Sequence, residues 1–406
     1  MADRKVLLVL DDAADADQVR PLLPGAVGIA VLITSRSDLR GPAVSHMART
    51  VPLDVLAPAE ARSLLAGALG ARQVSGEPEA AERLAALCAR LPPALRIAAA
   101  NLAARPGWSL TDYAAELAGD GRLAKLSVEG DRQAAVRAAF DHSYTALEPD
   151  TARLFGLLGL HPGPDFTAEA AAALLYSPPA VAERLLDRLA AAGLLQHTVA
   201  GRLRFHDLLR LYAAEDAAAD PDRATAWQRL CDWYLATTDA ATAFGYTGSV
   251  QLPRPRAASG RFADRHRALA WLEGERANLV AVITHAAEAG PRPIAWQLAD
   301  QLRPYFYRRR HQPEWEAATT AGLRAAESEG EVLAQAAMRH DFFLLRQHAG
   351  DVPAALEAVH LALEGYRRAG FAPVSRPATR TSPRTTATGR RPSPAPWSCV
   401  PRNTVR

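Results

Sequence analysis

The sequence contains few cysteines and no long uncharged apolar run. Its 406 residues include three cysteines. They are odd in number and far apart, which argues against a disulfide framework or a zinc site and favours a reducing compartment. No apolar run approaches the ~20 residues that a membrane-spanning helix needs, and we expect no signal peptide. These absences predict a cytoplasmic protein that makes no contact with a membrane.

Acidic residues are also missing from one part of the chain. The formal net charge is +3, but residues 374–406 hold seven arginines and no acid, so the remainder carries 3 − 7 = −4. The body of the protein is therefore not a polycation of the kind that binds nucleic acid. Residues 372–406 are rich in Pro, Arg, Thr and Ser, and we expect a disordered tail there. A shifted reading frame is our hypothesis for its origin.

What the sequence does contain begins with an apolar run that ends in two acids. Five consecutive apolar residues, Val6–Leu10, precede Asp11 and Asp12. Such a run predicts a strand covered by helices on both faces. Ligands bind at the carboxyl ends of strands in open α/β sheets. The two acids therefore have the pattern of a Walker B element, which serves Mg²⁺ and an attacking water. An ordinary solvated strand end is the alternative.

The following residues predict further elements of a sheet. We expect a short helix over Asp15–Leu23, a second buried strand over Ala30–Thr34 and a third short strand over Thr50–Leu53. Helical patterns then dominate the chain, because alanine, leucine, arginine and glutamate are good helix formers. The predicted fold class is mostly α, with a truncated α/β nucleotide-binding portion.

Five motifs in order resemble those of the NB-ARC class of STAND signal-transduction ATPases. They are Leu7–Asp12 for Walker B, Leu32–Arg36 for the sensor strand, Leu56–Leu65 for the helix with Glu60-Ala61, Arg90–Leu95 for Gly-Leu-Pro-Leu-Ala-Leu, and Phe205–Asp207 for Met-His-Asp. Arg90 replaces the family's glycine and Pro93 its second leucine. The order and spacing carry the resemblance, since each motif alone is short.

The resemblance implies roles for five residues. Asp11 would help to hold Mg²⁺ and Asp12 would orient the attacking water. Arg36 would sense the γ-phosphate, Pro92 would pack against the adenine, and His206 would reach the β-phosphate of ADP and hold a closed state. Each residue also has a simpler interpretation. Arg36 fits a solvated loop arginine, Pro92 fits the first turn of a helix, and His206 fits a structural histidine.

A phosphate-binding loop of the form Gly-x-x-x-x-Gly-Lys-Ser/Thr does not occur anywhere in the sequence. In the family this loop precedes the Walker B strand and supplies the backbone cradle, the lysine and the Mg²⁺-binding hydroxyl. We therefore expect a nucleotide-binding domain that is truncated at its N-terminal side, and an ATPase activity that this chain lacks. ADP, ATP and Mg²⁺ are the cofactors of intact relatives, and we do not expect tight binding of either nucleotide here.

The segments expected after the resemblance are mainly helical. They are residues 1–55 for the C-terminal part of the nucleotide-binding domain, 56–122 for a helical ARC subdomain, 123–219 for a winged helix, 220–290 for a helical linker, 291–371 for tetratricopeptide-like repeats, and 372–406 for the tail. Within the winged helix we expect a helix over Arg132–Ala146 and a hairpin that turns at Ala200-Gly201. DNA readout by Arg202 and Arg204 is an alternative use of this domain. A plain bundle of helical hairpins is the alternative to the repeats.

The same arrangement resembles the AfsR/SARP-type transcriptional regulators of actinobacteria. Their ADP/ATP-switched members activate secondary-metabolite genes, and they bind DNA through an N-terminal domain that this sequence does not contain. The resemblance implies protein partners at the repeats and a homo-oligomer. The alternative is a nucleotide-independent helical interaction module or an inactive remnant. No Ser/His/Asp or Cys/His motif suggests another hydrolase.

Overall fold

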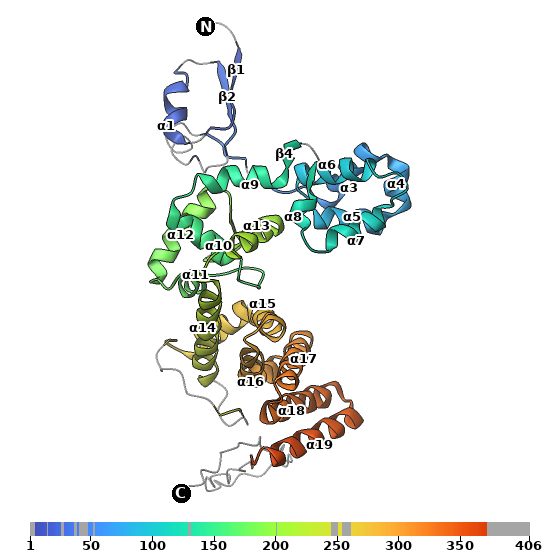
Figure 1. Cartoon of the computed structure of the whole chain (residues 1–406). Coiled ribbons are helices and arrows are strands. Elements are labelled where there is room, and N and C mark those ends of the chain that lie inside the picture. Colours follow the sequence, from blue (N-terminus) through green and yellow to red (C-terminus); the bar gives the residue numbers. More distant parts are fainter. Residues whose placement is uncertain are drawn as a thin grey trace, which may run out of the picture. The chain divides into compact units, whose positions relative to one another are not determined.

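A computed structural model describes most of the chain. The described residues are 5–13, 15–25, 28–35, 39, 48–51, 53–128, 131–199, 201–244, 251–253 and 261–371. The sensor residue Arg36 and the tail 372–406 lie outside them. Helices make up most of the described residues (Figure 1), which confirms the mostly α fold class.

The chain divides into two compact units. The first comprises Met1–Leu160 and Asp165–Arg223, and the second comprises His161–Pro164 and Ala224–Arg406. Among the described residues, no helix has both the length and the apolar composition that crossing a bilayer would require.

The first unit begins with a small parallel sheet. β1 (Val6–Leu10) pairs with β2 (Ile29–Ile33) over five residues, from Val6 opposite Ile29 to Leu10 opposite Ile33. The connection contains α1 (Ala16–Val19) and a 3₁₀ turn at Arg20–Leu22. Both predicted strands are therefore present.

Two expectations about this sheet were wrong. Leu7, Val9 and Leu32 are exposed, so one face of the pair is open, whereas the apolar runs predicted strands buried on both faces. The third strand, expected over Thr50–Leu53, is also absent from the described residues of that stretch. Pro52 has no N–H to donate to a neighbouring strand, which weakens any pairing there.

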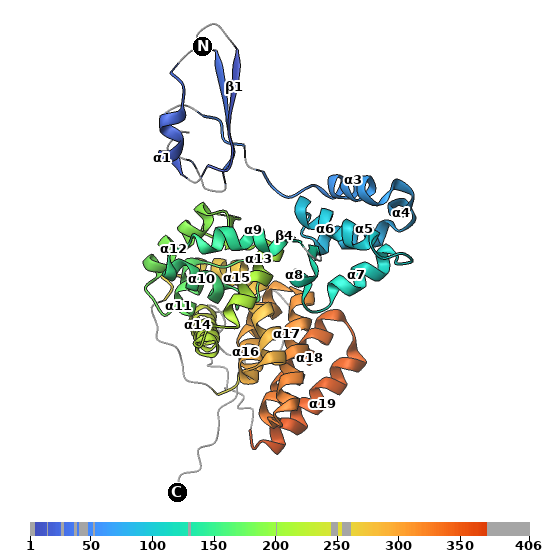
Figure 2. The same ribbon diagram turned by 45° about the horizontal axis from the view of Figure 1, so that its top comes forward.

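The next segment is helical, as predicted. Its elements are α3 (Pro58–Leu69), α4 (Ala71–Gly76), α5 (Pro78–Leu87), α6 (Pro92–Ala103), α7 (Leu110–Ala118) and α8 (Arg122–Lys125). Prolines in the first turn start three of these helices, where their missing N–H costs no helical hydrogen bond. These helices lie side by side (Figure 2). Most of the side chains buried between them are alanine and leucine.

Helices and a hairpin complete the first unit. The elements are β3 (Ser127–Val128), β4 (Asp131–Ala135), α9 (Val136–Thr145), α10 (Pro149–Leu158), α11 (Ala168–Leu175), α12 (Pro179–Ala191), β5 (Gln196–His197), β6 (Leu203–Arg204) and α13 (Asp207–Ala217). The helix predicted over Arg132–Ala146 begins only at Val136, because the preceding residues form an antiparallel pair with β3. The predicted hairpin turns at Gly201, whose φ of 78° suits glycine. The winged-helix assignment stays a prediction.

Long helices form the second unit. They are α14 (Arg223–Ala243), α15 (Arg265–Ala289), α16 (Arg292–Arg309), α17 (Gln312–Ser328), α18 (Val332–Ala349) and α19 (Val352–Arg368). From α15 onwards each helix packs against the next.

The last four helices form two hairpins of equal length. α16 and α18 begin at Arg292 and Val332, and α17 and α19 begin at Gln312 and Val352, so both helices recur after 40 residues. This period exceeds the 34 residues of a tetratricopeptide repeat. The helices account for it, because each is 17 or 18 residues long.

A charged cluster lies inside these hairpins. The Arg303 guanidinium of α16 donates to Asp300 at 2.6 Å and to Asp341 of α18, and all three side chains are at most 1% exposed. Arg303 also donates to the Ala337 carbonyl at 3.1 Å. Two buried carboxylates thus share one guanidinium.

Candidate functional site

Asp11 and Asp12 lie at the carboxyl end of β1, as their position after the apolar run predicts. Thr34, at the end of β2, joins them: its hydroxyl donates to the Asp11 carboxylate and accepts from the Asp12 backbone N–H at 2.9 Å. The backbone N–H of Thr34 donates to the Leu10 carbonyl, also at 2.9 Å. Parallel pairing of β1 and β2 brings these residues together, although 22 positions separate Asp12 from Thr34.

This strand end supplies only part of a magnesium–nucleotide site. Both acids are exposed, and the described residues contain no group of three His, Cys, Asp or Glu side chains that could hold a metal ion. Mg²⁺ in nucleotide sites is also held by substrate phosphates, which need a cradle, and the sequence has no Gly-x-x-x-x-Gly-Lys-Ser/Thr loop. The residues present therefore do not form a complete site for the nucleotide.

Pro92 occupies the first turn of α6, which its structural interpretation predicts. The backbone before it is unusual, because Ala89 and Arg90 have φ values of 52° and 53°. This left-handed region favours glycine. It therefore accounts for the glycine that the related motif carries at the position of Arg90. The Arg90 carbonyl accepts the backbone N–H of Leu56 at 3.1 Å.

His206 immediately precedes α13 as its N-cap residue. Burial lowers the pKa of its imidazole, with smaller opposing contributions from Asp54 and Asp207, which raise the pKa, and further lowering by Arg204 and Arg90. The imidazole is therefore neutral near pH 7.

The first unit thus brings His206 near the turn that precedes Pro92 and near Asp54. Asp11 and Asp12, in contrast, have Thr34 as their shared partner. Sequence reasoning missed Asp54 and Arg90 as neighbours of His206. The one signal in the sequence that could have drawn attention to Arg90 was its place at a position where the related motif has glycine.

Two curated proteins are similar in sequence to most of this chain. It is 42% identical over 294 residues to the protein described as "Regulatory protein AfsR" from Streptomyces griseus, and equally to that from Streptomyces coelicolor. The matched residues are 71% and 70% of this chain. Over these residues the chain is homologous to AfsR. It spans only about 30% of the length of these relatives.

Other comparisons add little to the AfsR homology. No protein-family model matches the chain. A solved STAND protein with a tetratricopeptide repeat sensor, from Pyrococcus horikoshii, is 15% identical, with 90% of this chain and 62% of that chain covered. The TM-score is 0.22, which does not establish a shared fold. The homology to AfsR agrees with the family that the five sequence motifs predicted.

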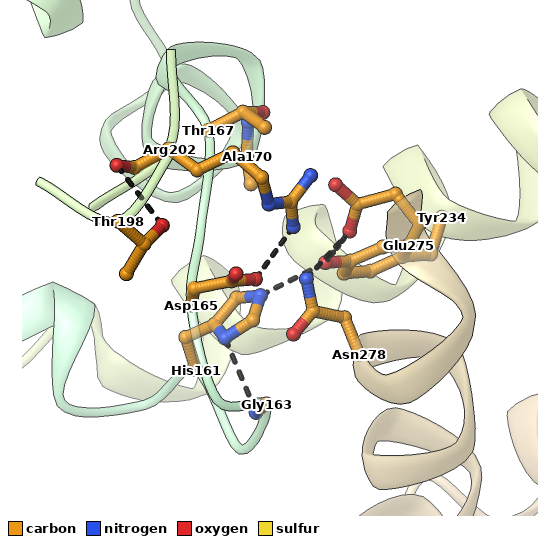
Figure 3. A network of polar contacts seen from close by, with 10 residues as sticks. All are labelled: His161, Gly163, Asp165, Thr167, Ala170, Thr198, Arg202, Tyr234, Glu275 and Asn278. Carbon is orange, nitrogen blue, oxygen red and sulfur yellow. Dashed lines mark hydrogen bonds and ion pairs between the residues drawn. The ribbon is translucent and has the colours of Figure 1, made fainter. Parts of the chain in front are cut away.

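The second unit contains a buried polar network whose residues belong to none of the five sequence motifs (Figure 3). The Gly163 N–H donates to His161 Nδ1 at 3.2 Å, which places the imidazole proton on Nε2, 2.8 Å from the Tyr234 hydroxyl. Tyr234 donates to Glu275 at 3.0 Å, and the Asn278 amide donates to the same carboxylate at 2.8 Å. These side chains come from a loop, α14 and α15, and no local pattern joins them.

An ion pair in the first unit bears on the DNA-readout alternative. Arg202 donates to Asp165 at 2.6 Å, and its side chain is only 13% exposed (Figure 3). Arg204 donates to Gln196 on the neighbouring strand. A guanidinium already engaged and largely buried is poorly placed to contact a base or phosphate, so the geometry disfavours DNA readout by Arg202.

Proposed function

We propose that this chain acts in a signal-responsive regulatory protein of the AfsR type. The observation that carries this proposal is the 42% identity over 294 residues to two proteins described as regulatory protein AfsR. Because the chain spans about 30% of their length, the proposal concerns a regulatory segment and assigns it no target gene.

In this proposal, the regulatory state depends on whether a phosphate is bound near His206. This imidazole is neutral near pH 7 because of burial, and it precedes the N-terminus of α13, where partial positive charge favours an anion. A phosphate placed there would raise the pKa of His206, since opposite charge favours the protonated form. Its neighbours Asp54 and Arg90 lie before α3 and before α6, in two segments that the hydrogen bond from the Leu56 N–H to the Arg90 carbonyl joins. An anion at His206 would therefore act on both segments. This geometry supports an ADP-dependent closed state.

The nucleotide part of the proposal requires a phosphate cradle that this sequence does not contain. Pro92 and His206 would contact the adenine and a phosphate, and Asp11 would contribute a carboxylate toward Mg²⁺. ADP in complex with Mg²⁺ would supply the charge that biases the packing of the domains. We therefore expect that this polypeptide alone binds ADP and ATP weakly.

Isothermal titration calorimetry of the full chain with Mg·ADP tests this proposal. Micromolar binding that Asp11→Ala and His206→Ala both abolish would support a residual switch, with Asp17→Ala as the matched control on an exposed acid of α1. Binding through His206 should also take up protons below pH 7, which is measured as a dependence of the heat on the ionisation enthalpy of the buffer. Binding that is insensitive to His206→Ala would overturn its role.

A second candidate function is a nucleotide-independent helical interaction module. It is favoured by the exposed Asp11 and Asp12 and by the absence of the Gly-Lys loop from the sequence. Helical hairpins commonly bind other proteins through their surfaces. If calorimetry gives no heat with either nucleotide, while the chain still binds a protein partner, this second function is the correct one.

A further inference from the structure

The loop between α10 and α11 takes part in both units of the chain. Residues His161–Pro164 belong to the second unit, although Leu160 before them and Asp165 after them belong to the first. The His161 side chain is 1% exposed, so it is buried rather than lying on the surface of a loop. The chain therefore leaves the first unit for a few residues and then returns to it.

The inserted residues are held by a buried polar network (Figure 3). His161 Nε2 lies 2.8 Å from the Tyr234 hydroxyl, which donates to Glu275. Tyr234 and Glu275 are at most 1% exposed. Gly163 has no space beside Asn278, because a Cβ at Gly163 would lie 2.1 Å from the Asn278 Oδ1. Buried polar groups are costly to leave without partners. The loop can therefore shift only if the network between α14 and α15 opens.

The two residues that follow the insertion are bound to the β5–β6 hairpin of the first unit. Asp165 accepts a hydrogen bond from the Arg202 guanidinium at 2.6 Å. The Phe166 N–H donates to the Leu203 carbonyl at 2.8 Å, and the Leu203 N–H donates to the Phe166 carbonyl at 3.0 Å. A side-chain ion pair and two backbone hydrogen bonds therefore join this end of the loop to β6.

Asp165 and Phe166 also lie close to both sides of His206. The Phe166 ring packs edge to face against Phe205, the residue before His206, with 5.6 Å between the ring centroids. Asp165 lies near Arg210 of α13, the helix that begins after His206. Burial lowers the pKa of Arg210, and the Asp165 carboxylate is one of two acids that oppose this effect. The end of the loop therefore borders the strand before His206 and the helix after it.

We propose that residues 161–166 form a connector that couples the buried network of α14 and α15 to the position of His206. Opening of the network releases the loop, and with it the contacts that Asp165 and Phe166 make beside His206. The coupling acts equally in the other direction, because a coupling free energy between two sites is reciprocal. A signal that alters the second unit reaches His206 in this way. This role rests on the proposed function of His206, whereas the coupling itself requires no nucleotide.

Hydrogen–deuterium exchange of the full chain without nucleotide, measured by mass spectrometry, tests this connector. Tyr234→Phe removes the hydroxyl that links His161 to Glu275 and keeps the rest of the side chain. Peptides that contain the paired amides of Phe166 and Leu203 should then exchange roughly tenfold faster, because stability lost from the network is also lost from the pairing that depends on it. Peptides of α5, in the same first unit, should exchange as in the wild type.

Leu345→Ala is the matched control for Tyr234→Phe. It removes buried atoms from α18, which packs against α16, α17 and α19, and so destabilises the second unit outside the network. Exchange at Phe166 and Leu203 should stay at the wild-type rate in this control. The proposal is overturned if Tyr234→Phe does not accelerate exchange there. Equal acceleration in Leu345→Ala, or an acceleration that extends to α5, overturns it as well.

Gly163→Ala tests the connector by steric displacement rather than by loss of a hydrogen bond. The added Cβ would lie 2.1 Å from the Asn278 Oδ1 and 2.8 Å from the His161 imidazole, so the loop must move. The peptides with Phe166 should again exchange roughly tenfold faster or more. Gly67→Ala, with open space around its Cβ position, is the control and should leave their exchange unchanged. Wild-type exchange in Gly163→Ala would contradict the connector.

The connector and the proposed function can fail separately, because the exchange measurement uses no nucleotide. If Mg·ADP calorimetry shows no binding but Tyr234→Phe accelerates exchange at Leu203, the connector holds and the nucleotide role of His206 fails. If ADP binds through His206 but exchange at Leu203 is insensitive to Tyr234→Phe, the connector fails and the nucleotide role holds.

Discussion

Raising the pH from about 5.5 to about 7 should destabilise the protein relative to its Asp341→Asn variant. Burial raises the pKa of Asp341 to about 7, with Arg303 opposing this effect and Asp300 adding to it. The unfolded state has a carboxyl pKa near 3.9. Between these two values the native state holds one proton more than the unfolded state, so the free energy of unfolding falls as the pH rises.

The expected size follows from the two pKa values. Over this pH interval the free energy of unfolding of the wild type should fall by about 1.5 kcal/mol relative to the variant. His340 opposes this change in both proteins, because burial and Arg303 lower its pKa to about 3. Its contribution is lost as the pH falls below about 6.5. Taking the difference between wild type and Asp341→Asn therefore isolates the carboxyl group.

Urea unfolding followed by tryptophan fluorescence measures this difference. Five of the seven tryptophans lie between Trp227 and Trp315, so the signal reports mainly on the second unit. Asp232→Asn is the control, because it removes an exposed carboxylate from the same unit. If the difference in the free energy of unfolding between wild type and Asp341→Asn stays constant from pH 5.5 to 7, then burial does not raise the pKa of Asp341.

Four further substitutions test helix packing, the buried polar network around Tyr234, and DNA readout at the hairpin. In thermal melts, Gly365→Ala should destabilise the protein by roughly 1–3 kcal/mol, because a Cβ there would lie 2.8 Å from a side chain of α18. Gly67→Ala is the control: it has open space around its Cβ position and should stabilise the protein by up to about 1 kcal/mol in the same melts. Tyr234→Phe should cost about 1–3 kcal/mol in urea unfolding, since it leaves the buried Glu275 with one donor fewer. Arg202→Ala should leave binding to duplex DNA unchanged in a fluorescence anisotropy titration, and a large loss of binding would revive DNA readout.

The local sequence predicted most elements of this protein well. The apolar run before Asp11 gives a strand, the prolines start helices, and Gly201 turns the hairpin, because each of these outcomes depends on neighbouring residues alone. The position of Asp11 and Asp12 at a strand end was confirmed for the same reason. Where the helical pattern failed, strand pairing with a neighbouring segment decided the outcome: residues 131–135 pair with β3, three to eight residues earlier, and the helix begins only after them.

The sequence by itself therefore determined the order and type of most elements and the family resemblance, since periodicity, turn residues and short motifs are local. Only the tertiary structure decided which polar side chains are buried together. Asp300, Arg303 and Asp341 look like ordinary surface charges in a helical pattern. Packing of α16 against α18 removes them from water, and burial then raises the pKa of Asp341. The neighbours of His206 depend in the same way on contacts between segments more than a hundred residues apart, which no local pattern encodes.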